Sequence, residues 1–116
     1  MLELEVSGNK YKLVKMDTFI QFNVARKLLP VLTSFDSGDI NVWANALANM
    51  PDDHAMFIVT ESLKACSRLD GGGYRQVYNA GGVMMYQDID LNVMIKLVSE
   101  LLKYNLENFS LAQILQ

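Results

Sequence analysis

The first 15 residues alternate apolar and polar side chains around the pair Gly8-Asn9, and this pattern constrains the fold most. A two-residue connection with glycine in its first position is typical of a type II′ hairpin turn. In that register Glu5 lies opposite Lys12 on one face of the hairpin. The other face carries four apolar side chains: Leu4, Val6, Tyr11 and Leu13. Because an isolated hairpin is not stable in water, we expect helices from the rest of the chain to cover this face.

Apolar spacing of three and four residues then predicts four helices. They cover approximately residues 17–35, 40–49, 51–69 and 91–106. Asp17, Asp39 and the pair Asp88/Asp90 precede helical segments and are expected to cap them. Pro30 lies inside the first segment, so we expect a kink or break near Leu29.

The first predicted helix is unusually rich in apolar side chains. Ile20, Val24 and Leu28 follow one another at intervals of four residues, and Val31 and Phe35 continue the same face. Additional apolar residues widen this face: Phe19, Phe22, Leu29 and Leu32. We therefore expect this helix to be buried on two sides.

These segments predict an α+β fold that is predominantly α-helical, with an N-terminal β-hairpin packed on four to five helices. The 116 residues fit a single domain, 1–116. Its expected parts are the hairpin (1–15), three helices (17–69), a glycine-rich connection (70–90) and C-terminal helices (91–116). The end of the last part is expected to be a short helix or a frayed terminus.

Composition excludes several classes of function. A formal net charge of −3 and a pI near 5.0 argue against nucleic-acid binding, which depends on basic residues that neutralise phosphates. The single cysteine, Cys66, cannot form an internal disulfide, and the N-terminus has no apolar stretch typical of a signal peptide. No apolar run is long enough to cross a bilayer, so we expect a cytoplasmic protein that does not contact a membrane.

The stretch LDGGGYRQVYNAGG, residues 69–82, raises the question of a phosphate-binding loop. A dinucleotide loop requires G-x-G-x-x-G after a strand, but Gln76 stands where the third glycine belongs and the preceding residues have helical spacing. The Gly-Lys-Ser/Thr ending of a P-loop is also missing. We therefore interpret the glycines as the end of the third helix and a connection, with a short extended arm over residues 74–78.

No set of residues for catalysis or metal binding can be assembled. His54, the only histidine, has just carboxylates as neighbours, and these are typical of the first turn of a helix. Cys66 lies three helical turns from His54 and is better explained as a small core residue. Asp88 and Asp90 are interpreted as helix caps rather than an acid–base pair. The sequence thus predicts no catalytic residue, no metal and no cofactor.

Two stretches resemble a known family. Residues 19–30 (FIQFNVARKLLP) follow a hairpin of the form V-x-G-x-x-Y-K-L, and residues 79–91 (NAGGVMMYQDIDL) lead into an apolar helix ending in NLENF. Together they resemble the small tail assembly chaperones of tailed bacteriophages and prophages. The resemblance implies a non-enzymatic protein, in the cytoplasm of the bacterial host, that binds the long helical tape-measure protein during tail assembly. It also implies absence from the finished virion and, in many systems, a longer form made by ribosomal frameshifting.

Two alternatives remain open beside the chaperone: a structural subunit of the tail or connector, and a helical adaptor of unrelated function. Whichever of the three functions is correct, the seven methionines either complete the core or contribute to a surface that binds a partner. If they form such a surface, we expect it to include the following residues: Val83, Met84, Met85, Phe109, Leu111, Ile114 and Leu115. The last four could instead mediate self-association.

Overall fold

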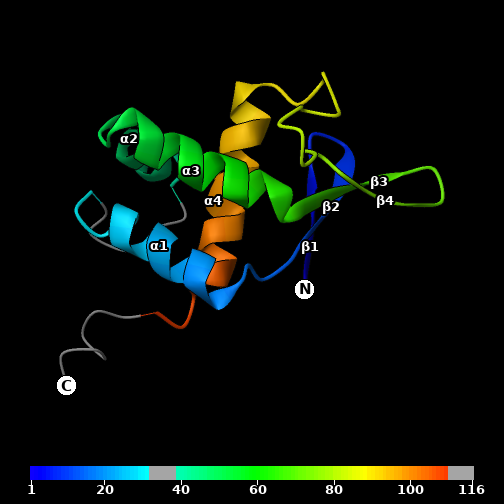
Figure 1. Cartoon of the computed structure of the whole chain (residues 1–116). Coiled ribbons are helices and arrows are strands. Elements are labelled where there is room, and N and C mark those ends of the chain that lie inside the picture. Colours follow the sequence, from blue (N-terminus) through cyan, green and yellow to red (C-terminus); the bar gives the residue numbers. More distant parts are fainter. Residues whose placement is uncertain (32–38, 110–116) are drawn as a thin grey trace.

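The computed structural model describes residues 1–31 and 39–109. Within these ranges the chain forms two strands, three helices, two further strands and a final helix (Figure 1). The bounds are β1 (Leu2–Val6), β2 (Asn9–Leu13), α1 (Thr18–Leu28), α2 (Ile40–Ala48), α3 (Asp52–Lys64), β3 (Cys66–Asp70), β4 (Gly73–Gln76) and α4 (Leu91–Asn105). The strands form one antiparallel sheet in the order β1-β2-β3-β4, so α1, α2 and α3 are inserted between two neighbouring strands.

The turn between β1 and β2 lies one residue earlier than predicted. Its central residues are Ser7 and Gly8, with φ of 51° and 83°, instead of Gly8 and Asn9. Two positive φ angles define a type I′ turn, which matches the twist of the strands as well as a type II′ turn does. Gly8 therefore has the expected role, but as the second central residue.

This change moves the register of the first hairpin by two residues. Leu4 lies opposite Tyr11, and Glu5 lies opposite Lys10 rather than Lys12. Because side chains alternate with a period of two, a shift of two leaves every side chain on its predicted face. Tyr11 and Leu13 are accordingly buried in the core.

The predicted fold class is wrong, because helices do not predominate over a single hairpin. The described residues contain four helices and a four-stranded antiparallel sheet. The difference lies in residues 66–76, which were expected to end the third helix and begin a connection but form the hairpin β3–β4. Cys66 pairs with Leu13 and Arg68 pairs with Tyr11. This pairing satisfies backbone groups of β2 that would otherwise form an open sheet edge, a gain that local helical spacing does not reveal.

The helix starts agree with the sequence. Asp17 accepts a hydrogen bond from Phe19 N, Asp39 accepts one from Asn41 N, and Asp90 accepts one from Val93 N. Helix α1 ends at Leu28, close to the predicted break before Pro30. The predicted continuation of this helix to residue 35 falls mostly outside the described residues.

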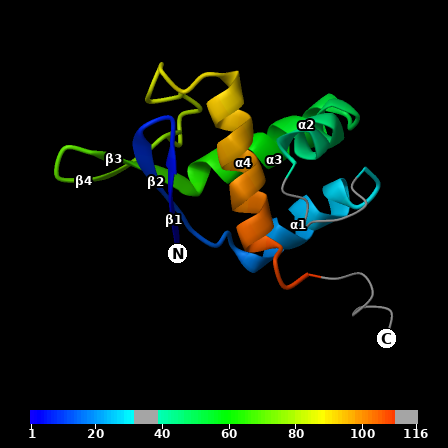
Figure 2. The same ribbon diagram turned by 180° about the vertical axis from the view of Figure 1, so that it is seen from behind.

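Helix α4 forms the centre of the molecule. It packs against α2 and α3 on one side and against β1 on the other, as both ribbon views show (Figures 1 and 2). Leu97, Val98, Leu101 and Leu102 of α4 are fully buried, together with Val24 and Leu28 of α1 and Trp43 of α2. The core therefore lies around α4, and the sheet closes it at one end.

Helix α1 departs from its predicted burial. Val24, Ala25 and Leu28 face the core, but Phe19 and Phe22 are 78% and 58% exposed. The structure buries this helix on one face only, which leaves two large aromatic side chains at the surface. Single exposed apolar residues are ordinary, whereas these two phenylalanines, one turn apart, form a small exposed apolar patch on α1.

Candidate protein-binding site

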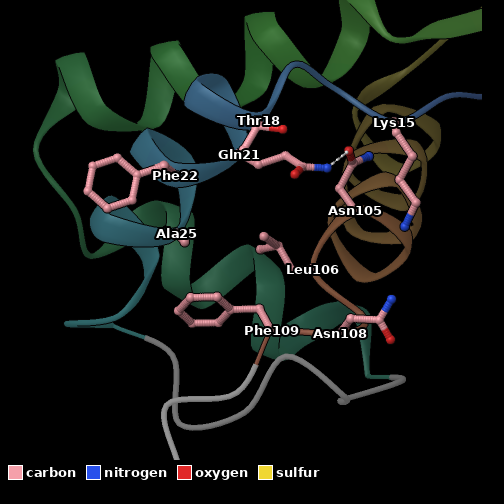
Figure 3. Close-up of a pocket in the computed structure, with 9 residues that line it drawn as sticks. All are labelled: Lys15, Thr18, Gln21, Phe22, Ala25, Asn105, Leu106, Asn108 and Phe109. Atoms are coloured by element: carbon pink, nitrogen blue, oxygen red, sulfur yellow. Dashed lines mark hydrogen bonds between the residues drawn. The ribbon is translucent and has the colours of Figure 1, made fainter. Parts of the chain in front are cut away.

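A pocket of about 420 Å³ opens between α1 and the C-terminal end of α4, and we call it the α1–α4 groove (Figure 3). The side chains of Phe22, Ala25, Leu106 and Phe109 form its apolar half. The described residues that line it are Lys15, Thr18, Gln21, Phe22, Ala25, Asn105, Leu106, Asn108 and Phe109. The small side chain of Ala25 lies between the two aromatic rings and leaves space for an apolar group. An apolar hollow with a polar border is the usual form of a recognition site.

The polar half of the groove is held together by Asn105, near the end of α4. Its Oδ1 accepts hydrogen bonds from Met16 N at 2.6 Å and from Gln21 Nε2 at 3.0 Å. Its Nδ2 donates to Val14 O at 3.2 Å and to Leu101 O at 3.0 Å. This side chain therefore fixes the segment before α1, and α1 itself, against α4 and sets the width of the groove.

One cation lies at the polar border. Lys15 Nζ is 3.1 Å from Glu107 Oε1, it donates to the Tyr104 carbonyl, and it lies 4.1 Å from the centroid of the Tyr104 ring. These contacts compensate the ammonium charge within the protein. The groove thus presents apolar groups, amides and a hydroxyl, but little net charge.

Phe22 is the most exposed apolar member of the lining. The Arg26 guanidinium lies 5.7 Å from the Phe22 ring centroid, and Phe19 is next to Phe22 one turn back along α1. Sequence reasoning named Phe109 of this lining but missed Phe22, because it expected both phenylalanines of α1 to be buried. The available signal was an excess of apolar residues around α1, more than a helix packed on one side can bury.

Val83, Met84 and Met85 belong to a tight loop between β4 and α4. Asn79 N donates to Val83 O at 3.0 Å, Asn79 Oδ1 accepts from Val83 N at 3.0 Å, and Met85 N donates to Val77 O at 2.8 Å. Val83 and Met85 are 55% and 53% exposed, whereas Met84 packs partly against the core. Met85 also borders a second pocket, between this loop and the hairpin β3–β4, together with Asp70 and Tyr86. We call Val83 to Met85 the loop surface.

The four predicted partner-binding residues that the structure describes lie at opposite ends of α4. The loop surface lies at the N-terminal end of α4, and Phe109 lies beyond its C-terminal end (Figures 1 and 2). The 15 residues of α4 separate them by about 22 Å, at ~1.5 Å per residue. Leu111, Ile114 and Leu115 lie outside the described residues.

The residues considered for chemistry occupy structural positions. His54 lies in the first turn of α3, and residues 1–31 and 39–109 contain no group of three His, Cys, Asp or Glu side chains able to hold a metal. Cys66 is fully buried as the first residue of β3, and burial raises the pKa of its thiol to about 12, so it is no nucleophile. Asp88 does not cap a helix but pairs with Arg68 at 2.7 Å.

The glycine-rich stretch is a hairpin turn rather than a phosphate cradle. Gly71 and Gly72 connect β3 to β4, with Asp70 opposite Gly73 and φ of 65° at Gly71. No helix follows the turn, so it lacks the helix N-terminus that binds phosphate in a nucleotide loop. In the part of the chain that the structure describes, no helix is long and apolar enough to cross a membrane.

These features define a small domain of helices and one antiparallel sheet, with an open apolar groove and, among its described residues, no recognisable catalytic or metal-binding set. A family model described as "Phage tail assembly chaperone protein, TAC" matches residues 7–114. Because the match covers nearly the whole chain, this protein belongs to the phage tail assembly chaperone family. No curated protein and no solved structure matches the chain.

Proposed function

We propose that this chain is a non-enzymatic chaperone that binds the tape-measure protein in the cytoplasm of the bacterial host, through the α1–α4 groove. The observation that carries the proposal is the groove itself, where exposed Phe22 borders a hollow floored by Ala25 and Leu106. Family membership supplies the role in tail assembly, and the resemblance described above supplies the client.

An amphipathic helix is the form of client that suits this groove. Such a helix binds by placing apolar side chains, spaced three, four and seven residues apart, into a hydrophobic groove. The apolar half accepts one or two of these side chains, and the amides of Gln21, Asn105 and Asn108 remain at the border for polar groups of the helix. A helical client with apolar residues exposed before assembly fits this chemistry.

We assign the loop surface to a second contact with the same client. Val83 and Met85 are exposed apolar side chains at the other end of α4, and methionine adapts to irregular partner surfaces. A client helix longer than about 22 Å has the length needed to reach from one end of α4 to the other, at ~1.5 Å rise per residue.

Co-expression with the tape-measure protein of the same genome tests the proposal. We expect Phe22→Asp to abolish co-purification and Met85→Asp to weaken it, with unchanged far-UV circular dichroism in both variants. Met56→Asp is the matched control, because Met56 is 60% exposed on α3 and belongs neither to the groove nor to the loop surface. If the client is equally soluble and full length without this chain, and no complex is recovered, the proposed function is wrong.

Mass spectrometry of purified phage particles tests the chaperone role against a structural one. An assembly chaperone is expected to be missing from finished particles. Many copies per particle would instead identify a tail subunit and would overturn the proposal.

A further inference from the structure

The exposed side of α1 extends the α1–α4 groove beyond its lining. Phe19, Phe22 and Arg26 are all exposed and follow one another at intervals of three and four residues. They therefore lie within about 60° of one another around the helix, and we call them the α1 ridge. Phe22 also lines the groove, between α1 and Phe109 of the opposite wall (Figure 3). The ridge and the apolar half of the groove thus form one continuous surface.

Arg26 brings a positive charge to this surface. Its guanidinium lies 5.7 Å from the centroid of the Phe22 ring, and none of the ion pairs among the described residues includes it. The cation at the other border of the groove, Lys15, is paired with Glu107 at 3.1 Å. Within the part of the chain that the structure describes, Arg26 is therefore the cation beside the groove that has no carboxylate partner.

We propose that Arg26 selects the client: the helix that binds the groove carries a carboxylate that pairs with Arg26, while an apolar side chain of the same helix lies between Phe22 and Phe109. This inference rests on the proposed function for the location of the site, and it adds the chemistry by which the client is recognised.

The spacing on α1 defines the spacing expected on the client. Phe22 and Arg26 are four residues apart, which is about 6 Å along α1 at ~1.5 Å per residue. A client helix that runs along α1 covers this distance in the same number of residues. Side chains three or four residues apart share one face of a helix. We therefore expect the carboxylate three or four residues from the apolar side chain that enters the groove.

The surroundings of Arg26 favour a carboxylate over other groups. A guanidinium can donate two parallel hydrogen bonds to a carboxylate, and it can do so while one of its faces lies against an aromatic ring. The Phe22 ring lies next to the Arg26 guanidinium, and a bound client helix would exclude more water from it. Fewer water molecules mean weaker screening, so the ion pair becomes stronger in the complex.

The same charge rejects the wrong client. A helix with lysine or arginine at the corresponding position would bring two positive charges together at a surface from which water is being removed, and such contacts are unfavourable. Specific interfaces commonly combine attraction of one partner with repulsion of another. Apolar groups of the groove accept many amphipathic helices, whereas Arg26 distinguishes among them by charge.

The expected effects are moderate for loss of the charge and larger for its reversal. Because exposed ion pairs contribute little, we expect Arg26→Gln to weaken client binding about two- to fivefold. Arg26→Glu places two carboxylates opposite each other and should weaken binding at least about tenfold. The affinity of the wild type should also fall more steeply with salt than that of Arg26→Gln, since salt screens the ion pair.

The test uses the full-length chain and overlapping peptides that cover the tape-measure protein of the same genome. Fluorescence anisotropy identifies the peptide that the wild type binds most tightly, and its affinity is then measured for Arg26→Glu and Lys27→Glu. Lys27 is the matched control, because its ammonium lies 4.7 Å from the ring centroid of Phe57 on α3, about 100° around α1 from Arg26. Both variants change the net charge equally, and far-UV circular dichroism checks that both are folded.

We expect only Arg26→Glu to lose binding. A second peptide, in which the carboxylate is replaced by lysine, should bind the wild type more weakly and recover its affinity with Arg26→Glu. Equal affinities of Arg26→Glu and Lys27→Glu, or no recovery with the lysine peptide, would overturn the inference. In either case the proposed function stands, because the wild type still binds the client. If the wild type binds neither a peptide nor the intact tape-measure protein, the proposed function itself is wrong and this inference fails with it.

Discussion

Replacement of Asn105 by alanine is the sharpest test of how the groove is built. The Asn105 side chain is 7% exposed and makes four hydrogen bonds, of which three connect α4 to α1 and to the segment that precedes α1 and the fourth lies within α4. Alanine removes all four while preserving helix propensity. The change therefore isolates the loss of the junction from any effect on the helix itself.

The expected loss follows from what each partner can do afterwards. Met16 N is buried and loses its acceptor, which costs about 1–3 kcal/mol. Gln21 Nε2 and Val14 O are partly exposed and can bind water instead, so each contributes roughly 0.5 kcal/mol. Leu101 O loses only an additional donor. We therefore expect Asn105→Ala to lower the free energy of unfolding by about 2–4 kcal/mol.

Urea denaturation gives this quantity directly. Trp43 is the only tryptophan in the chain and is 1% exposed, so its fluorescence reports loss of the core. The matched control is Gln21→Ala, which removes one hydrogen bond at the same junction and should cost about 0.5 kcal/mol. On heating, a loss of 2–4 kcal/mol corresponds to a fall in Tm of about 8–16 °C, at ~4 °C per kcal/mol for a domain of this size.

The two variants must differ for the reasoning to hold. If Asn105→Ala and Gln21→Ala lower the free energy of unfolding by equal amounts, within about 0.5 kcal/mol, then the buried donor of Met16 is not what Asn105 satisfies. A loss above about 5 kcal/mol would contradict the estimate as well, because it would require collapse of packing beyond the junction.

Three further predictions concern the rest of the fold. Ser7→Asn should raise the free energy of unfolding by up to about 1 kcal/mol in urea titrations, because Asn-Gly suits two positive φ angles better than Ser-Gly; a loss of stability would contradict the type I′ turn. Cys66 should react with Ellman's reagent only as fast as the protein unfolds, since its thiol is buried with a pKa of about 12; rapid reaction of the native protein would refute this. The hydrogen bond from Arg68 holds the pKa of Asp88 below its ordinary value of 3.8. Asp88→Asn should therefore destabilise the protein above about pH 4, and the difference should fade as the pH falls through the folded-state pKa; a difference that grows in acid would reverse the assigned sign.

The sequence alone determined the features that depend on neighbouring residues. Asp17, Asp39 and Asp90 cap helices where their positions predict, because a cap requires only a side-chain oxygen next to the first free N–H groups. The alternation of apolar and polar residues also predicts which side chains share a face of the first hairpin. This prediction is unaffected by the change in register, because the strands are shifted by two residues. Resemblance indicated the family, which the match over residues 7–114 confirms.

Only the tertiary structure decided the sheet and the groove. Residues 66–70 have helical spacing, but pairing with the edge of β2, more than 50 residues earlier in the chain, makes them a strand. The pair Gly71-Gly72 is itself a hairpin signal, whose meaning depends on the strands on both sides of it. Of the groove, Phe109 was predicted and Phe22 was assigned to the core. An apolar residue faces solvent or core according to where the other elements pack, and that is set by long-range contacts that no local pattern contains.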